Sequence, residues 1–306
     1  MSGYAPFPRS GSPLVVPTAS RSAAVAAIAM YTPCRRRSVL VRDLLWWAVR
    51  VLGPRVLPVA RVAWPLPVEP PVWNGMCAQM GDALPASWDS LAVHRRAGDR
   101  PGATVAFIAD GRQAAVARIE PEHERGADRE VEALRIVDAH APSTFTVPRV
   151  RAAGRCAGWA WTVTSPVRLG RHRMVVGAPV ARVAEEIGDV LAALPRPAGT
   201  PAHWRPFHGD FVPWNLRTTR SGGRALLDWE SAGWAPPGAD LALYGASARA
   251  VARSPGIAWA AGPEVVGYWR RAIGERIRAA RERDLAPDPL NRRILALLEQ
   301  RRPLGV

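Results

Sequence analysis

The fold is decided by the stretch HGDFVPWN, residues 208–215, together with LLDWE, residues 226–230. Pro213 excludes a helix interior and biases Val212 toward extended backbone. Residues 210–215 are therefore expected to form a loop that aims the side chains of Asp210 and Asn215 at one point.

A short hairpin is predicted directly after this loop. Residues 215–218 and 223–228 have the character of two strands joined by the turn Thr219-Arg220-Ser221-Gly222. Such a hairpin returns Asp228 to the neighbourhood of Asn215. A carboxylate, an amide five residues later and a second carboxylate beyond a turn have the spacing used in phosphoryl transfer.

These segments, with Gly238-Ala239-Asp240-Leu241-Ala242 after them, resemble the aminoglycoside phosphotransferase and choline kinase family. The resemblance is strong over roughly residues 204–244, moderate over roughly residues 90–194 and poor at both ends. It implies an α+β, bilobal protein-kinase-like fold, with a small β-rich N-lobe and a larger, mainly helical C-lobe. The implied activity is ATP- and Mg²⁺-dependent phosphorylation of a hydroxyl group on a small molecule.

The resemblance also implies a role for each residue of the motif. Asp210 would be the catalytic base, and Asn215 and Asp228 would be the metal ligands. His208 is expected to anchor the loop through hydrogen bonds, since a histidine in this motif does so more often than it acts as a base. Asp240 is expected to have a structural role at the start of a helix.

The N-lobe of such a fold begins with a strand, a glycine-containing loop and a two-strand meander. Strands are predicted at residues 90–95, 104–109 and 113–119, with Asp110-Gly111 as a hairpin turn. The loop between the first two strands contains Gly98 and Gly102, whose backbone N–H groups are candidates for contact with nucleotide phosphates. Two glycines are equally typical of a plain turn.

The resemblance places the family's phosphate-contacting lysine at Arg118, in the stretch Ala115–Pro121. Arginine keeps the positive charge but presents a longer planar fork, so the change is not conservative at a tight site. Its partner acid is expected on a helix over residues 127–139. There Glu130 shares a face with Leu134 and Val137, whereas Glu132 turns away.

Composition and charge limit the remaining possibilities. The chain has 306 residues, is 48% hydrophobic and carries a net charge of +15, and all of its basic residues are arginines. The excess lies at the two ends: residues 1–64 contain nine Arg and one acidic residue, and residues 270–302 contain ten Arg and five acidic residues. No nucleic-acid motif accompanies this charge, which argues against a nucleic-acid partner.

The N-terminal region carries a separate prediction. Residues 1–20 are rich in Ser, Pro and Gly and are expected to be disordered, and residues 21–84 are expected to form a basic, helical and Pro-rich extension. A helix over residues 38–52 has an apolar stripe formed by Leu40, Leu44, Trp47 and Val51. Such a stripe most often packs on its own domain. The alternative is contact with an anionic membrane surface.

The predicted organisation is then an N-lobe over residues 85–165 and a C-lobe over residues 166–306. Cys34, Cys77 and Cys156 lack metal-site or disulfide spacing, so a cytoplasmic protein is expected. Arg118 and the minimal glycine loop leave open a pseudokinase that binds nucleotide or a partner without turnover. The charged ends leave open a membrane-surface or nucleic-acid-associated protein. The sequence does not identify the acceptor or the oligomeric state.

Overall fold

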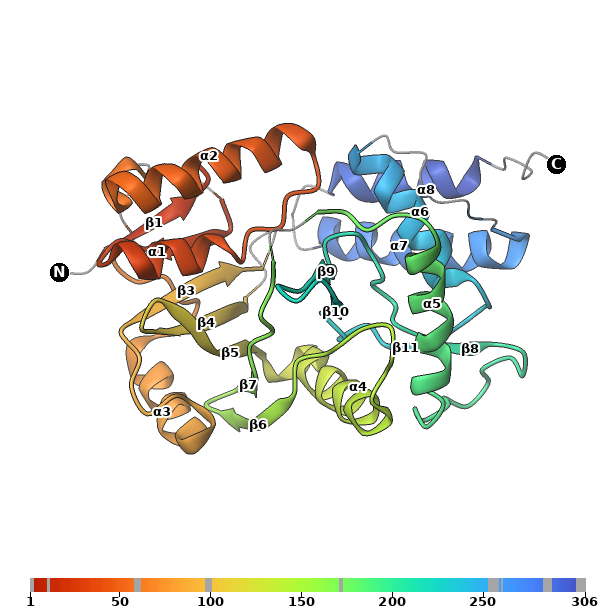
Figure 1. Cartoon of the computed structure of the whole chain (residues 1–306). Coiled ribbons are helices and arrows are strands. Elements are labelled where there is room, and N and C mark those ends of the chain that lie inside the picture. Colours follow the sequence, from red (N-terminus) through yellow and green to blue (C-terminus); the bar gives the residue numbers. More distant parts are fainter. Residues whose placement is uncertain are drawn as a thin grey trace. The chain divides into compact units, whose positions relative to one another are not determined.

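The computed structural model describes residues 3–9, 12–57, 62–96, 101–170, 173–252, 259, 261–282 and 288–300. The chain forms two compact units (Figure 1). Unit 1 comprises Met1–Val131 and Pro148–Val167, and unit 2 comprises Glu132–Val147 and Arg168–Val306. Unit 1 contains a large β-sheet, whereas most of the regular structure of unit 2 is helical.

Unit 1 is built on a seven-stranded antiparallel sheet with the order β1-β2-β3-β4-β5-β7-β6. The strands are β1 (Tyr4–Phe7), β2 (Leu14–Pro17), β3 (Ser90–Arg95), β4 (Ala103–Ala109), β5 (Arg112–Pro121), β6 (Val150–Cys156) and β7 (Trp159–Thr164). The predicted turn between β4 and β5 is present: Asp110 and Gly111 both have positive φ, 52° and 69°. Two such residues match the right-handed twist of the flanking strands.

Both faces of this sheet are covered by helices, and alternate residues of each strand point to opposite sides. One face packs Val105, Phe107 and Ala117 against α3 (Pro70–Met80). The other face packs Ala92, Ala106 and Ile108 against α1 (Arg21–Ile28) and α2 (Arg36–Leu52). The helical segment before β3 is therefore an integral part of unit 1 (Figure 1).

The expectation of disorder for residues 1–20 was wrong for the described residues of this range, which include two strands. β2 pairs with β3 through Leu14↔His94 and Val15↔Val93, and β1 pairs with β2. Leu14 and Val16 contribute to the core under α1, whereas Val15 contributes to the core under α3. The apolar runs are only four residues long, so the surrounding Ser, Pro and Gly obscured them, but pairing with β3 is enough to order them.

The apolar stripe of α2 also differs from the expectation. Val49 is buried, and Leu45 and Trp46 pack against the core formed with α1. The stripe residues themselves are 49–61% exposed; they are Leu40, Leu44, Trp47 and Val51. The helix carries two apolar faces, and the one that packs on unit 1 is the face opposite the predicted stripe.

Unit 2 gathers its core between three helices, α6 (Ala239–Ala252), α7 (Pro263–Glu282) and α8 (Pro289–Glu299). Leu243, Trp269, Ile273 and Ile294 are buried there together. The unit also contains α5 (Ala178–Val190) and two small antiparallel ribbons, β8 (Arg205–Phe207) with β11 (Gly233–Ala235) and β9 (Leu216–Thr218) with β10 (Arg224–Leu226). Helix α4 (Gly126–His140) begins in unit 1 and ends in unit 2.

Within the described ranges, no helix combines the length and the apolar character needed to cross a membrane. The three cysteines, Cys34, Cys77 and Cys156, are all free thiols.

Replacing Leu14 by Ala tests whether the N-terminal strands belong to the core of unit 1. Leu14 is fully buried, so we expect Leu14→Ala to lower the free energy of unfolding by about 2–5 kcal/mol. The same substitution at Leu40, which is 61% exposed, should change it by no more than about 0.5 kcal/mol. Urea unfolding followed by circular dichroism measures both. Equal effects would show that β2 does not pack as described.

Candidate active site

Residues 208–215, here called the motif loop, follow β8. This loop is held by a buried, neutral histidine. His208 is fully buried; its Nδ1 accepts a hydrogen bond from the Asp210 N–H at 3.1 Å, and its Nε2 donates to the Leu227 carbonyl at 3.1 Å. These two bonds fix the tautomer that carries its proton on Nε2. Burial lowers the pKa of His208 to about 4. Both ring nitrogen atoms of His208 are therefore used in hydrogen bonds that hold the loop, which is the anchoring role expected from the sequence.

Asp240 fixes the start of the same loop from the first turn of α6. Its carboxylate accepts hydrogen bonds from the backbone N–H groups of His208, at 2.7 Å, and Gly209, at 3.1 Å. Gly209 has a φ of 79°, and a Cβ atom there would collide with the carbonyl oxygen of Ser231. Only glycine accommodates both constraints, which explains its position in the motif.

The loop and the β9–β10 hairpin bring Asp210, Asn215 and Asp228 into one part of unit 2. Asn215 Nδ2 donates to the Asp210 carboxylate at 2.8 Å and to the Asp210 carbonyl at 3.0 Å. The hairpin pairs Leu216 with Leu226, and the Leu227 N–H donates to the Asn215 carbonyl at 3.1 Å. Asp228 directly follows Leu227, and its negative charge acts on the carboxyl group of Asp210.

The backbone of Asp228 is itself unusual. Its φ is 68°, in the left-handed region that few residues other than glycine adopt. Non-glycine residues in this region cost conformational energy and cluster at functional sites, where the surrounding structure holds them. Here the hairpin before Asp228 and the bond from His208 to Leu227 provide that restraint.

Opposing electrostatic effects act on the pKa of the Asp210 carboxyl group. Burial and the negative charge of Asp228 raise its pKa to about 6, whereas Arg276 and the hydrogen bond from Asn215 oppose the shift. Arg276, on α7, places Nη1 3.8 Å from the carboxylate of Asp210 and donates from Nη2 to the Gly209 carbonyl at 3.4 Å. Two mutually repelling carboxylates favour a bound cation, because a cation would relieve the repulsion.

The oxygen atoms of Asn215 and Asp228 are suitable ligands for magnesium. They are the carboxylate oxygen atoms of Asp228 and the amide oxygen of Asn215, whose amide nitrogen is already used by Asp210. In the described part of the chain, no three His, Cys, Asp or Glu side chains form a metal cage. Magnesium does not need one, since it is usually held by one or two protein oxygens together with water and substrate phosphates.

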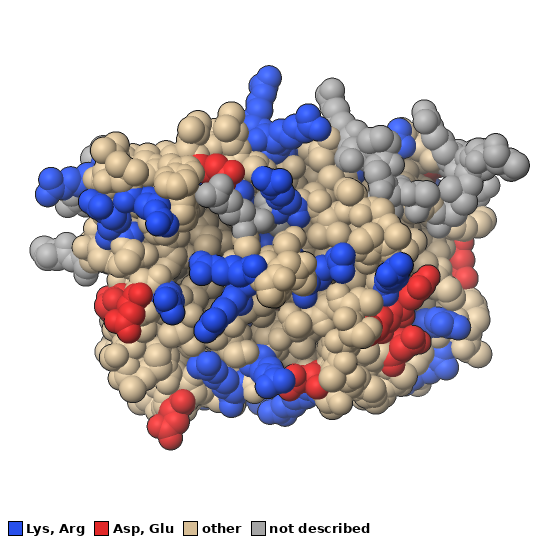
Figure 2. Space-filling view, in the orientation of Figure 1, with Lys and Arg blue, Asp and Glu red and all other residues tan. Residues whose placement is uncertain are grey.

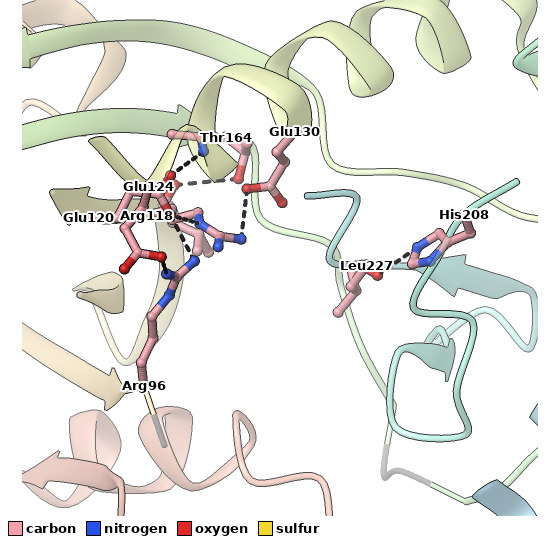
Figure 3. A network of polar contacts seen from close by, with 10 residues as sticks. Arg96, Arg118, Glu120, Glu124, Glu130, Thr164, His208 and Leu227 are labelled. Atoms are coloured by element: carbon pink, nitrogen blue, oxygen red, sulfur yellow. Dashed lines mark hydrogen bonds and ion pairs between the residues drawn. The ribbon is translucent and has the colours of Figure 1, made fainter. Parts of the chain in front are cut away.

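In unit 1, Arg118 lies on β5 between two acidic side chains (Figure 3). Its Nη1 is 3.3 Å from Glu130 on α4, and its Nε is 3.2 Å from Glu120. Arg96 contacts the same oxygen of Glu120 at 2.7 Å. Glu120 is fully buried and also accepts the Ala127 N–H at the start of α4. The carboxylate of Glu120 thus ties β5, α4 and the end of β3 together.

Sequence reasoning missed Glu120, Arg96 and Arg276. The signal for Glu120 was present, because residues 118 and 120 of a strand point to the same face. Arg96 contacts Glu120 across the sheet, and Arg276 reaches the motif loop from a helix far along the chain. No local sequence pattern predicts these two contacts.

The two glycines predicted to contact phosphates have different outcomes. Gly102 accepts a hydrogen bond from the Arg96 N–H at 3.2 Å, and a Cβ atom there would lie 3.0 Å from the Ile119 carbonyl oxygen. Gly102 therefore lies close against the backbone of β5. Gly98 lies outside the described residues. A phosphate-binding role for either glycine stays a prediction.

Comparison with known proteins agrees with the motif. Residues 181–295 match the model of the phosphotransferase enzyme family. This range contains His208, Asp210, Asn215, Asp228 and Arg276. The comparison with curated proteins gave no significant match.

Several solved structures are similar to this chain. A thermostable mutant of aminoglycoside phosphotransferase APH(4)-Ia, in its apo form, is similar with a TM-score of 0.50 and 14% identity, over 74% of this chain and 97% of that one. Aminoglycoside 2'-phosphotransferase-IIIa bound to GDP gives a TM-score of 0.46 and 15% identity, over 74% and 96%. Macrolide 2'-phosphotransferase MphH from Brachybacterium faecium gives 0.43 and 16%, over 75% and 97%.

The predicted α+β kinase-like fold and the resemblance to the aminoglycoside phosphotransferase family are therefore confirmed. The class of enzyme predicted from the sequence, a phosphotransferase with an alcohol group as acceptor, is the class to which the matched family model belongs. At 14% identity the similarity to the first of these structures concerns the fold alone.

Two substitutions test the electrostatic description of Asp210 in the metal-free protein. Asp228→Asn should lower the pKa of Asp210, because it removes the neighbouring negative charge that raises it. Arg276→Gln should raise the pKa, because it removes the opposing positive charge. The ¹³C NMR titration of the Asp210 carboxyl group measures both shifts. Shifts of the same sign would contradict the arrangement.

Proposed function

Because residues 181–295 carry the sequence signature of the phosphotransferase enzyme family, we propose that the protein transfers the γ-phosphoryl group of ATP to a hydroxyl of a small molecule. The observation that carries the proposal is the hydrogen-bonded pair of Asp210 and Asn215, with Asp228 returned beside it by the β9–β10 hairpin. In this proposal the arrangement provides one base and two oxygen ligands, which are among the parts that phosphoryl transfer uses.

In this proposal Asp210 accepts the proton of the acceptor hydroxyl. The hydroxyl oxygen then forms its bond to the γ-phosphorus while the bond to the bridging oxygen of the departing ADP breaks. Asn215 holds the Asp210 carboxylate through Nδ2, at 2.8 Å, and thereby orients the base. Asn215 Oδ1 and the Asp228 carboxylate would hold Mg²⁺, which when bound neutralises the charge of the phosphates.

Arg118 supports the phosphates in the same proposal. Its guanidinium is held in a fixed orientation by Glu120 and Glu130, through two different nitrogen atoms. A planar fork fixed in this way presents its N–H donors in defined directions, which suits recognition of phosphate oxygens. Glu130 and Glu120 are therefore positioning residues for Arg118.

The charge around Asp210 limits the class of compound that can serve as the acceptor. Arg276 lies 3.8 Å from Asp210, and α7 carries further exposed arginines, Arg270, Arg271, Arg278 and Arg281. A polycationic acceptor would be repelled from such a helix. A neutral or anionic hydroxyl compound, such as a sugar or a polyol, fits this charge better.

One observation favours the alternative of a nucleotide-binding pseudokinase, namely the arginine at position 118. Its fork is engaged by two carboxylates, an arrangement that a lysine would not reproduce. Calorimetry with Mg-ATP and an assay of ATP consumption with a panel of sugars, polyols and aminoglycosides separate the two functions. Binding without turnover across the panel would favour the pseudokinase. Absence of Mg-ATP binding would refute both.

Removal of the base should act on the chemical step. We expect Asp210→Ala to lower turnover by roughly two to four orders of magnitude and to leave the affinity for Mg-ATP nearly intact. Asp228→Ala should weaken Mg-ATP binding, because it removes an oxygen ligand that would hold Mg²⁺. Turnover and calorimetric affinity are measured for each variant.

Asp189→Ala is the matched control for this pair, since Asp189 is exposed on α5. It should leave both quantities at the wild-type level. The role of Asp210 would be refuted by a variant that keeps wild-type turnover, and the role of Asp228 by unchanged Mg-ATP affinity.

Arg118→Lys tests whether the site is built around a guanidinium. An ammonium is a single point on a shorter chain and does not bridge Glu120 and Glu130 as two separate nitrogens do. We therefore expect this substitution to lower turnover about tenfold or more. Arg155→Lys is the matched control, because Arg155 also bridges two acids, Glu122 and Asp128, but is 52% exposed. Higher turnover in Arg118→Lys would show that the arginine is instead a partial defect.

A further inference from the structure

Helix α2 exposes a continuous apolar stripe in unit 1. Leu40, Leu44, Trp47 and Val51 are 61%, 60%, 49% and 61% exposed, and their spacing of four, three and four residues sets them on one side of the helix. Val41 and Leu52 are exposed beside them. Isolated exposed apolar side chains are ordinary, but a contiguous patch of six on one helix marks an interaction surface.

The opposite side of α2 holds the helix in place. Val49 is fully buried, and Leu45 and Trp46 pack against the core that α2 shares with α1. Arg42 is also buried on this side and is paired with Asp43 at 2.9 Å. The exposed stripe is therefore presented by a helix that is docked on unit 1 through its opposite side.

Basic residues flank the stripe. At 100° per residue, Arg36 and Arg50 fall on one side of it and Arg37 on the other, and all three are exposed. The Arg50 guanidinium lies over the rings of Trp46 and Trp47, 5.1 and 5.7 Å from their centroids. Asp43 is the sole acidic residue of α2. The surface thus combines an apolar centre, a tryptophan and a cationic border.

This combination identifies the partner by its chemistry. If a second copy of the chain docked here by twofold symmetry, the arginines that border the stripe in one copy would face those of the other copy. This repulsion is unfavourable. Nucleic-acid phosphates would satisfy the arginines but leave the apolar stripe without a partner. An anionic bilayer complements both parts, since its headgroups attract arginine and its acyl boundary takes up leucine, valine and tryptophan.

Overall charge alone would not single out α2. Figure 2 shows basic side chains spread over the whole face in view. Only on α2 do the described residues join them to an exposed stripe of this size, because the other strongly exposed apolar residues, Trp64, Trp88 and Val176, are scattered. We therefore propose that α2 is a peripheral membrane-binding helix that lies on an anionic lipid surface through Leu40, Leu44, Trp47 and Val51.

The test uses the full-length protein and two kinds of vesicle, phosphatidylcholine alone and phosphatidylcholine mixed with phosphatidylglycerol. Co-sedimentation at low salt should show binding to the mixed vesicles, weaker binding at high salt and little binding to the neutral ones. The double variant Leu44→Ser, Trp47→Ser should bind the mixed vesicles at least about tenfold more weakly. The control Trp88→Ser, Val176→Ser removes exposed apolar side chains elsewhere and should bind as wild type.

A second pair of variants tests the charge. Arg36→Gln, Arg37→Gln should lower binding to the mixed vesicles by about ten- to thirtyfold. Loss of folding would not account for this, because both arginines lie in the first turn of α2, where positive charge opposes the helix dipole. Arg278→Gln, Arg281→Gln on α7 removes the same charge and should have no comparable effect.

Several results would overturn the proposal. They are absence of wild-type binding to the mixed vesicles, equal binding to neutral and anionic vesicles, and unchanged binding in the α2 variants. Self-association in gel filtration that is lost in Leu44→Ser, Trp47→Ser, without vesicle binding, would instead assign the stripe to contact between copies. Circular dichroism and thermal unfolding establish that each variant is folded. ATP turnover is not needed for any of these outcomes.

Discussion

The site in unit 2 depends on one buried constraint, the pair of hydrogen bonds from the His208 and Gly209 N–H groups to the carboxylate of Asp240. Through it the motif loop is attached to the first turn of α6, whose other residues form the core with α7 and α8. The imidazole of His208 then reaches the Leu227 carbonyl, one residue before Asp228. A change in the helical core would therefore move Asp210 and Asp228 together.

The part of this arrangement that local rules govern could be predicted from the sequence. The proline in the loop, the turn between β9 and β10 and the strand period were sufficient to place Asp210, Asn215 and Asp228 near one another. Arg276 could not be found in this way, because its contact with Asp210 depends on how α7 packs against the rest of unit 2. The packing of segments far apart in the sequence decides which arginine of a basic helix faces an acidic side chain. Amino-acid composition does not predict this.

The N-terminal region shows a different limit of sequence reasoning. Periodicity located α2 and one of its apolar faces correctly, yet the helix has a second apolar face, formed by Leu45, Trp46 and Val49, that packs on unit 1. Which of two apolar faces is buried depends on the shape of the surface it meets, here α1 and the sheet. The strands β1 and β2 were missed for a related reason, since a four-residue strand gains its stability from its neighbour, β3, and has little pattern of its own.

Arg118 shows how a guanidinium group is held by the acidic side chains around it. A lysine at this position would need one acid, whereas the guanidinium has enough donors for Glu130 and Glu120 at once, and Glu120 in turn holds Arg96. A nucleotide phosphate would compete with these carboxylates for N–H donors, so the carboxylates cannot simply add to the affinity. In the proposed function their contribution would be geometric: they would restrict the rotamers of a flexible side chain before a phosphate binds, which would reduce the entropy lost on binding. Arg118 is thus one member of a network that also contains Glu120, Glu130 and Arg96.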